Sequence, residues 1–153
     1  MQIMTYFLAS IISYLGLLAG VILVKMAPEE QNPGKKYFIL IKKIIFLLII
    51  AFLLAYYQIN FIFSSFLLLF LFILMLAKKI RLEKSALAYF FLGIVLSLSS
   101  KFTDLFIIES ALVFLYGIAA GSLLLKQKSE NYREIFVSNL WFFAPVVILY
   151  FII

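Results

Sequence analysis

The stretch from Asp104 to Lys126, DLFIIESALVFLYGIAAGSLLLK, decides how the rest of the chain can be organised. Its apolar run is long enough to cross a membrane as a helix, because about 20 residues span a hydrocarbon core of ~30 Å. One acid, Glu109, lies inside the run. A cluster of small residues follows it: Gly117, Ala119, Ala120, Gly121 and Ser122. The stretch therefore predicts a spanning helix with one acidic residue and one closely packed face.

A similar cluster occurs near the start of the chain. Gly16, Ala19, Gly20 and Lys25 match Gly117, Ala120, Gly121 and Lys126 at a constant offset of 101 residues, with Leu8 opposite Glu109. Small residues four apart let membrane helices approach closely, so helix packing is the favoured interpretation. Because both stretches run in the same direction, a parallel internal repeat of the first and fifth helices is the alternative.

The composition is that of a membrane protein. Of 153 residues, 67% are hydrophobic and 13% are charged, and the mean hydropathy is +1.20, whereas soluble domains contain about 25% charged residues. Six spans are predicted, at 3–24, 38–57, 59–77, 85–101, 104–125 and 135–153. They leave loops too short for a second domain. We therefore predict one all-α, polytopic membrane domain over residues 1–153 with six transmembrane helices.

The basic residues alternate between the connections. Of the 13 lysines and arginines, all except Lys101 fall in the first, third and fifth connections and their helix ends. The positive-inside rule then places those connections in the cytoplasm and both termini outside. The first helix is expected to be retained, because it lacks the positive n-region of a signal peptide.

The first connection contains APEEQNPGKKY, residues 27–37. Pro28 is expected to open a short helical turn and Pro33-Gly34 to end it. We interpret Glu29 and Glu30 as loop residues rather than a catalytic pair. The flanking lysines, including Lys42 and Lys43, are expected to extend to the cytoplasmic interface and meet anionic lipid. No nucleic-acid partner is expected.

Polar residues gather in the predicted outer third of the spans. They are Ser97, Ser99, Ser100, Lys101, Thr103, Asp104 and Glu109. Glu109 lies five residues inside Asp104, or about 7.5 Å deeper, and shares a helix face with Tyr116. An uncompensated charge at mid-membrane costs roughly 2.5–3.5 kcal/mol. Glu109 is therefore either an ion or proton site, or a structural group that is wetted or paired with Lys101.

The last span carries Asn139 and Pro145. Pro145 has no N–H for the carbonyl of Trp141, so a kink is expected there, with a free acceptor beside Asn139. Such a break either lines a binding site or packs against a neighbouring helix, and packing is the commoner case.

The chain contains neither histidine nor cysteine. Serine and cysteine triads are therefore excluded, as are the usual metal ligands. No phosphate-binding glycine loop occurs. We expect no enzymatic activity, no cofactor and no metal centre.

These observations favour a small transporter or channel-like permease. Its ion or solute would enter an outer vestibule near Lys101, Asp104 and Glu109, along a path lined by Tyr116 and Asn139, with Glu109 as the coupling group. It would act as an oligomer through the third span or the Gly16/Gly20 face. The alternative is a non-catalytic subunit of a larger membrane complex. The richness in Ile, Phe, Lys and Tyr suits the cell membrane of a prokaryote.

Overall fold

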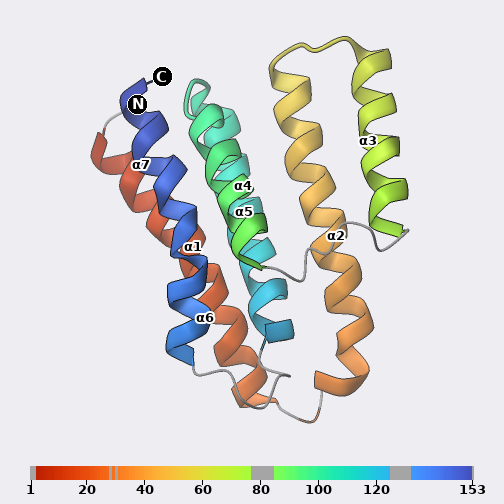
Figure 1. The fold of residues 1–153 in the computed structure, drawn as a ribbon, viewed down its shortest axis with the longest axis vertical. Helices are drawn as coiled ribbons and strands as arrows, with labels where there is room; N and C mark the ends of the chain where they lie inside the picture. The colour runs from red at the N-terminus through yellow and green to blue at the C-terminus, as the bar shows by residue number, and fades with distance from the viewer. Residues whose placement is uncertain (1–2, 28, 30, 77–84, 125–131, 153) are drawn as a thin grey trace.

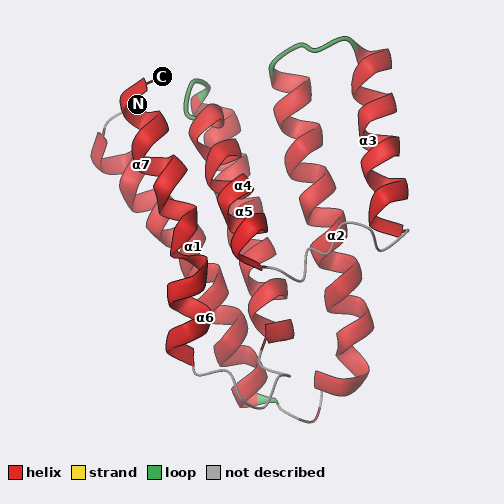
Figure 2. Ribbon diagram, in the orientation of Figure 1, coloured by secondary structure: helices red, strands yellow, loops and turns green. Residues whose placement is uncertain are grey.

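The computed structural model describes residues 3–27, 29, 31–76, 85–124 and 132–152, and all regular structure in them is helical (Figure 2). The helices are α1 (Ile3–Met26), α2 (Gln31–Tyr56), α3 (Phe61–Leu76), α4 (Ser85–Ser99), α5 (Thr103–Leu124), α6 (Tyr132–Asn139) and α7 (Phe143–Ile152), with the 3-10 turn η2 (Leu140–Phe142) between the last two. The prediction of an all-α chain is confirmed.

Within the described residues, three helical stretches are long and apolar enough to cross a membrane. They are Ile3–Met26, Pro33–Tyr56 and Thr103–Leu124. Three further apolar stretches are shorter: Phe61–Met75, Ala86–Ser99 and Phe136–Ile152. Length and composition thus support the prediction of a membrane protein.

The start of α2 differs from the sequence prediction. Pro33 and Gly34 do not end a separate turn, because both lie within α2, which begins at Gln31. A proline is tolerated in the first turn of a helix, since its missing N–H would have no intrahelical partner there. The helix consequently starts seven residues earlier than the predicted span.

Consecutive long segments run antiparallel, and α1 begins at the end of the bundle where α7 ends (Figure 1). Helix α5 lies in the middle and contacts α1, α2 and α4. Helix α4 also packs against η2 and α7, whereas α3 packs mainly against α2. The residues buried around α5 therefore form the centre of the molecule.

Helices α1 and α5 approach each other through glycine. A Cβ atom added to Gly117 would lie 2.7 Å from the backbone nitrogen of Leu17 and 2.8 Å from the carbonyl carbon of Gly16. One added to Gly16 would overlap the carbonyl group of Phe114. Real Cβ atoms do not approach backbone this closely. The backbones of the two helices are therefore in contact, and any larger residue at these positions must push them apart.

The two small-residue clusters face each other in parallel register. Gly117 lies against Gly16, and Gly121 lies against Gly20. Ser13 Oγ donates to the carbonyl of Ser110 at 3.0 Å. This bond joins the same two helices nearer their N-terminal ends. The offset of 101 residues in the sequence is therefore the register of one interface, and helix packing accounts for the match without a duplication.

Two tyrosines of α1 hold the last helical segment on either side of its break. The Tyr14 hydroxyl donates to the carbonyl of Phe136 at 2.7 Å, and the Tyr6 hydroxyl donates to that of Val146 at 2.9 Å. The turn η2 lies between these points and ends three residues before Pro145, which is in the first turn of α7. A Cβ atom on Gly93 of α4 would lie 2.7 Å from Cγ of Pro145. The break is thus a packed contact with α4.

The turn between α2 and α3 shows how its sequence ends one helix and starts the next. Gln58 adopts a positive φ of 52°, and the N–H of Ile59 donates to the carbonyl of Leu54 at 3.2 Å. This pattern is the Schellman C-cap. Asn60 Oδ1 then accepts from the N–H of Ile62 at 3.0 Å, as an N-cap residue does.

We expect Gly16→Ala and Gly121→Ala each to destabilise the protein by about 1–3 kcal/mol, the usual cost of overpacking. Gly34→Ala is the matched control. Its Cβ would meet only the side chain of Phe38, at 3.1 Å, and alanine favours a helix by up to ~1 kcal/mol over glycine. Unfolding in detergent micelles measures the difference. Equal stability of all three variants would contradict the close contact between α1 and α5.

Candidate functional site

Glu109 lies in the centre of the bundle. It is 0% exposed and sits on the face of α5 that also carries Val113, Tyr116 and Ala120, all at most 1% exposed. Neither carboxyl oxygen has a hydrogen-bond partner in the described part of the chain. A charge in such a place carries a large desolvation cost unless a proton, a cation or a hydrogen-bond donor offsets it.

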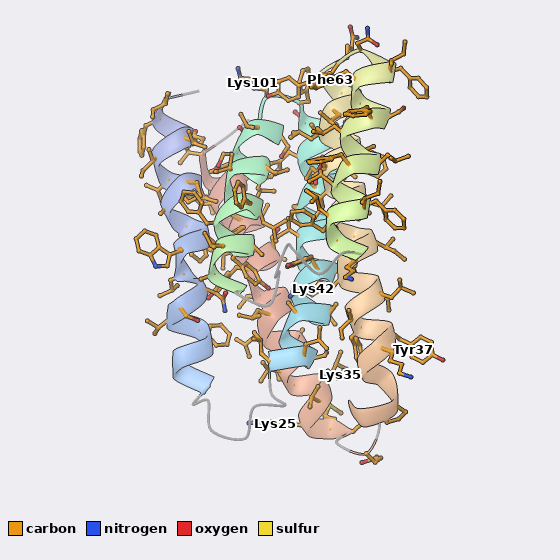
Figure 3. The ribbon with its side chains drawn as sticks, turned by 45° about the vertical axis from the view of Figure 1, so that its right-hand side comes forward. Lys25, Lys35, Tyr37, Lys42, Phe63 and Lys101 are labelled. Carbon is orange, nitrogen blue, oxygen red and sulfur yellow. The ribbon has the colours of Figure 1, made fainter. Side chains whose placement is uncertain are left out.

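The two other charged residues expected near Glu109 lie apart from it. Lys101 and Asp104 are exposed at the end of the bundle where α5 begins, and Figure 3 shows Lys101 at that end. The carboxyl group of Glu109 is buried and has no hydrogen bond to Lys101 in the described part of the chain. The predicted site is thus divided into an exposed pair and a buried acid.

The outer serines do not line an open vestibule. Ser97 and Ser99 are buried. The hydroxyl groups of Ser97, Ser99 and Ser100 bond to backbone carbonyls of Gly93, Leu96 and Ser97 at 2.7, 2.8 and 2.6 Å. Such bonds to the preceding turn satisfy serine inside a helix.

The side chain of Lys42 is buried in the bundle, whereas the sequence predicted that it would extend outward to the lipid interface. It lies about 13.5 Å along α2 from Pro33, counted at 1.5 Å per residue, and Figure 3 shows it between Lys35 and Lys101 along the bundle. The side chain is only 8% exposed. Its Nζ lies 5.5 Å from the centroid of the Tyr116 ring, within cation–π range. Neighbouring Lys43 donates to the carbonyl of Met75 on α3 at 3.0 Å.

Tyr116, which Lys42 contacts, also packs against Tyr89. Their ring centroids are 6.0 Å apart in an edge-to-face arrangement. Both side chains are 0% exposed, and both hydroxyl groups are without a hydrogen-bond partner among the described residues. Lys42, Tyr89 and Tyr116 therefore bring one ammonium and two phenols together from α2, α4 and α5. We call these three residues the Lys42 cluster.

Other buried tyrosines differ from this pair. Tyr14 packs beside Tyr89, with ring centroids 5.9 Å apart, yet its hydroxyl is bonded to a carbonyl of α6. Buried tyrosine hydroxyls usually find such a partner. The two unpartnered phenols, like Glu109, are therefore unusual for a purely structural interior.

Asn139 and Pro145 occupy the last helical segment. Asn139 is 0% exposed at the end of α6. The carbonyl of Pro145 accepts from Ser97 Oγ at 3.3 Å. The break is therefore bonded to its neighbours rather than open to solvent, and no described contact joins Asn139 to Glu109.

Within the described ranges, no three Asp, Glu, His or Cys side chains gather where they could hold a metal ion. The chain matches no protein-family model, and neither a curated protein nor a solved structure shows significant similarity to it. The arrangement of side chains is thus the basis for any functional proposal.

Glu109 and Tyr116 were predicted from the sequence as site residues, whereas Tyr89 and the burial of Lys42 were not. A signal for both existed. Each lies inside an apolar run rather than at its end, whereas lysine and tyrosine at the interface occupy the ends of spans. Their proximity to Tyr116 could not be read from the sequence, because it depends on how α2 and α4 are rotated against α5.

We expect Tyr89→Phe and Tyr116→Phe to keep or increase stability, by up to about 1–3 kcal/mol, because each removes a buried hydroxyl without a partner. Tyr14→Phe is the control, and should lose about 1 kcal/mol with its hydrogen bond. Thermal unfolding in detergent compares the three variants. A loss of stability in both Tyr89→Phe and Tyr116→Phe equal to that in Tyr14→Phe would show that their hydroxyls are bonded.

Proposed function

We infer that the chain is a small six-span membrane transporter for an ion or small solute, with Glu109 as the group that binds the coupling proton or cation. The observation that carries this proposal is the carboxyl group itself, wholly buried in a spanning helix and without a partner in the described residues. Intramembrane acids are rare, and they mark ion and proton pathways.

The need to neutralise Glu109 links it to transport. A proton or a cation bound to the carboxyl group removes its charge and allows the residue to stay in the apolar interior. Release of that ion requires water, so a transport cycle includes a second conformation in which Glu109 is accessible. In this proposal the present structure is the closed conformation.

The six-span topology with both termini outside is part of the proposal. The antiparallel course of the helices supports it (Figure 1). Lys25 and Lys35 lie toward one end of the bundle and Lys101 at the other (Figure 3), which agrees with the alternating charges of the connections. The location in a prokaryotic cell membrane stays a prediction from composition.

The second candidate function is that of a subunit in a larger membrane complex. Helix α3 favours it, because this helix packs mainly against α2 and exposes Phe61, Ile62, Phe63, Phe66, Leu69, Phe70, Phe72 and Ile73. The Gly16/Gly20 face is not available for oligomer contacts, since α5 covers it. A partner or a second copy would therefore bind at α3.

Glu109→Gln tests the transport proposal. Reconstituted in liposomes, the unmodified protein should carry a proton or cation flux that the variant loses, because glutamine has a similar shape but binds no ion. Asp104→Asn, an exposed acid on the same helix, should keep the flux. If the unmodified protein carries no flux and Glu109→Gln changes only stability, the subunit function is favoured instead.

The topology has its own test, made simple by the absence of native cysteine. Single cysteines replacing the exposed residues Gln58, Lys101 and Lys35 are treated with a membrane-impermeant maleimide in intact cells. Gln58→Cys and Lys101→Cys should react, and Lys35→Cys should react only after the cells are permeabilised. Labelling of all three in intact cells would refute the six-span arrangement.

A further inference from the structure

The neighbours of Glu109 on its own helix are apolar. The side chains one turn before it and one turn after it on α5 are those of Leu105, Phe106, Leu112 and Val113. Leu105 and Val113 are 0% exposed, and Phe106 is 2% exposed. Helix α5 therefore offers this carboxyl group no polar side chain one turn away.

Helices α2 and α4 offer none at the level of Glu109 either. Both run antiparallel to α5 (Figure 1). The other members of the Lys42 cluster pack against Tyr116, which lies two turns of α5, or about 10.5 Å, from Glu109. Residues 44–55 of α2 and 90–96 of α4 continue from the cluster toward the level of Glu109, and none of them carries a polar side chain.

The hydroxyl groups of the surrounding helices are bonded elsewhere. On α1, those of Tyr6, Ser10 and Ser13 donate to backbone carbonyls at 2.9, 2.8 and 2.8 Å. On α4, Ser97 Oγ does the same at 2.7 Å. The carboxyl oxygens of Glu109 have no partner in the described residues, so nothing in the described helices around α5 bonds to them.

A metal cation and a proton need different surroundings. A cation that leaves water requires several oxygen atoms in place of its hydration shell, and in transporters unwound backbone carbonyls help to supply them. Helix α5 is continuous through Glu109. The other acids whose side chains the structure describes, Glu29 and Asp104, are exposed. A proton, in contrast, requires only one oxygen of the carboxyl group itself.

We propose that the ion bound by Glu109 is a proton rather than a metal cation, so that the buried side chain is an uncharged carboxylic acid. An uncharged acid is far less costly to bury than a carboxylate. This inference rests on the proposed transport function and deepens it, because it makes the proton the coupling ion. Loss of the proton leaves a charge that the apolar neighbours do not stabilise, so proton release accompanies the opening of Glu109 to water.

Infrared spectroscopy tests the bound proton without any transport step. The purified protein in non-ionic detergent at neutral pH should show the carbonyl stretching band of a protonated carboxylic acid. We expect this band to be lost completely in Glu109→Gln and kept in Asp104→Asn, the matched exposed acid on the same helix. Glutamate labelled with ¹³C in its side-chain carboxyl group should shift the band, which identifies a glutamate without any substitution. Absence of the band from the unmodified protein would overturn the proposal.

Thermal unfolding tests for a bound cation. Sodium, potassium or calcium chloride replaces choline chloride at constant ionic strength, and each should change the melting temperature of the unmodified protein and of Glu109→Gln equally. A saturable stabilisation by one of these cations that is lost in Glu109→Gln would show a cation at the carboxyl group and would also overturn the proposal.

Flux measurements separate this inference from the transport function. In liposomes, a pH gradient should drive the flux that depends on Glu109 in choline chloride, with neither sodium nor potassium present. The carboxylic acid band without any flux would support proton binding and remove the transport function alone. A flux that requires sodium or potassium, in a protein without the band, would remove this inference alone.

Discussion

The backbone contact between α1 and α5 is the constraint on which the remaining arrangement depends. Lipid provides no hydrophobic drive for helices to associate, so close packing and hydrogen bonds must hold them together. Facing glycines bring the two backbones into contact, and Ser13 adds a hydrogen bond across the pair. With α5 fixed in this way, its other faces meet α2 and α4, and the tyrosines of α1 reach the last helical segment.

Polar groups in the interior fall into two kinds. Ser97 and the hydroxyls of Tyr6 and Tyr14 bond to backbone carbonyls, and they connect α1 and α4 to the broken last segment. The carboxyl group of Glu109 and the hydroxyls of Tyr89 and Tyr116 have no such partners in the described residues. The first kind explains how the helices are held. The second kind is what a ligand or a proton would complete, and it lies on α4 and α5, where α2 brings in Lys42.

The helices themselves could be predicted almost completely, because apolar runs of spanning length have few alternatives. The error at the start of α2 came from treating Pro33-Gly34 as a terminator, although proline in a first turn removes no hydrogen bond. The candidate site could be predicted only in part. Glu109 and Tyr116 share a face of one helix, and the helical period gives that directly. Lys42 and Tyr89 belong to other helices, and the period of one helix says nothing about its neighbours.

The sequence by itself determined the class of the protein, the positions of its helices and the one acid inside a span, since each of these follows from the order of residues along one segment. The tertiary structure decided that the repeated small residues are two sides of one contact, that Lys42 lies over Tyr116, and that Glu109 is separated from Lys101. These are relations between helices. They depend on how each helix is rotated and placed against the next. In an almost uniformly apolar chain, many rotations of a helix bury equally apolar side chains. Only the packing of the helices in three dimensions therefore decides which rotation is adopted.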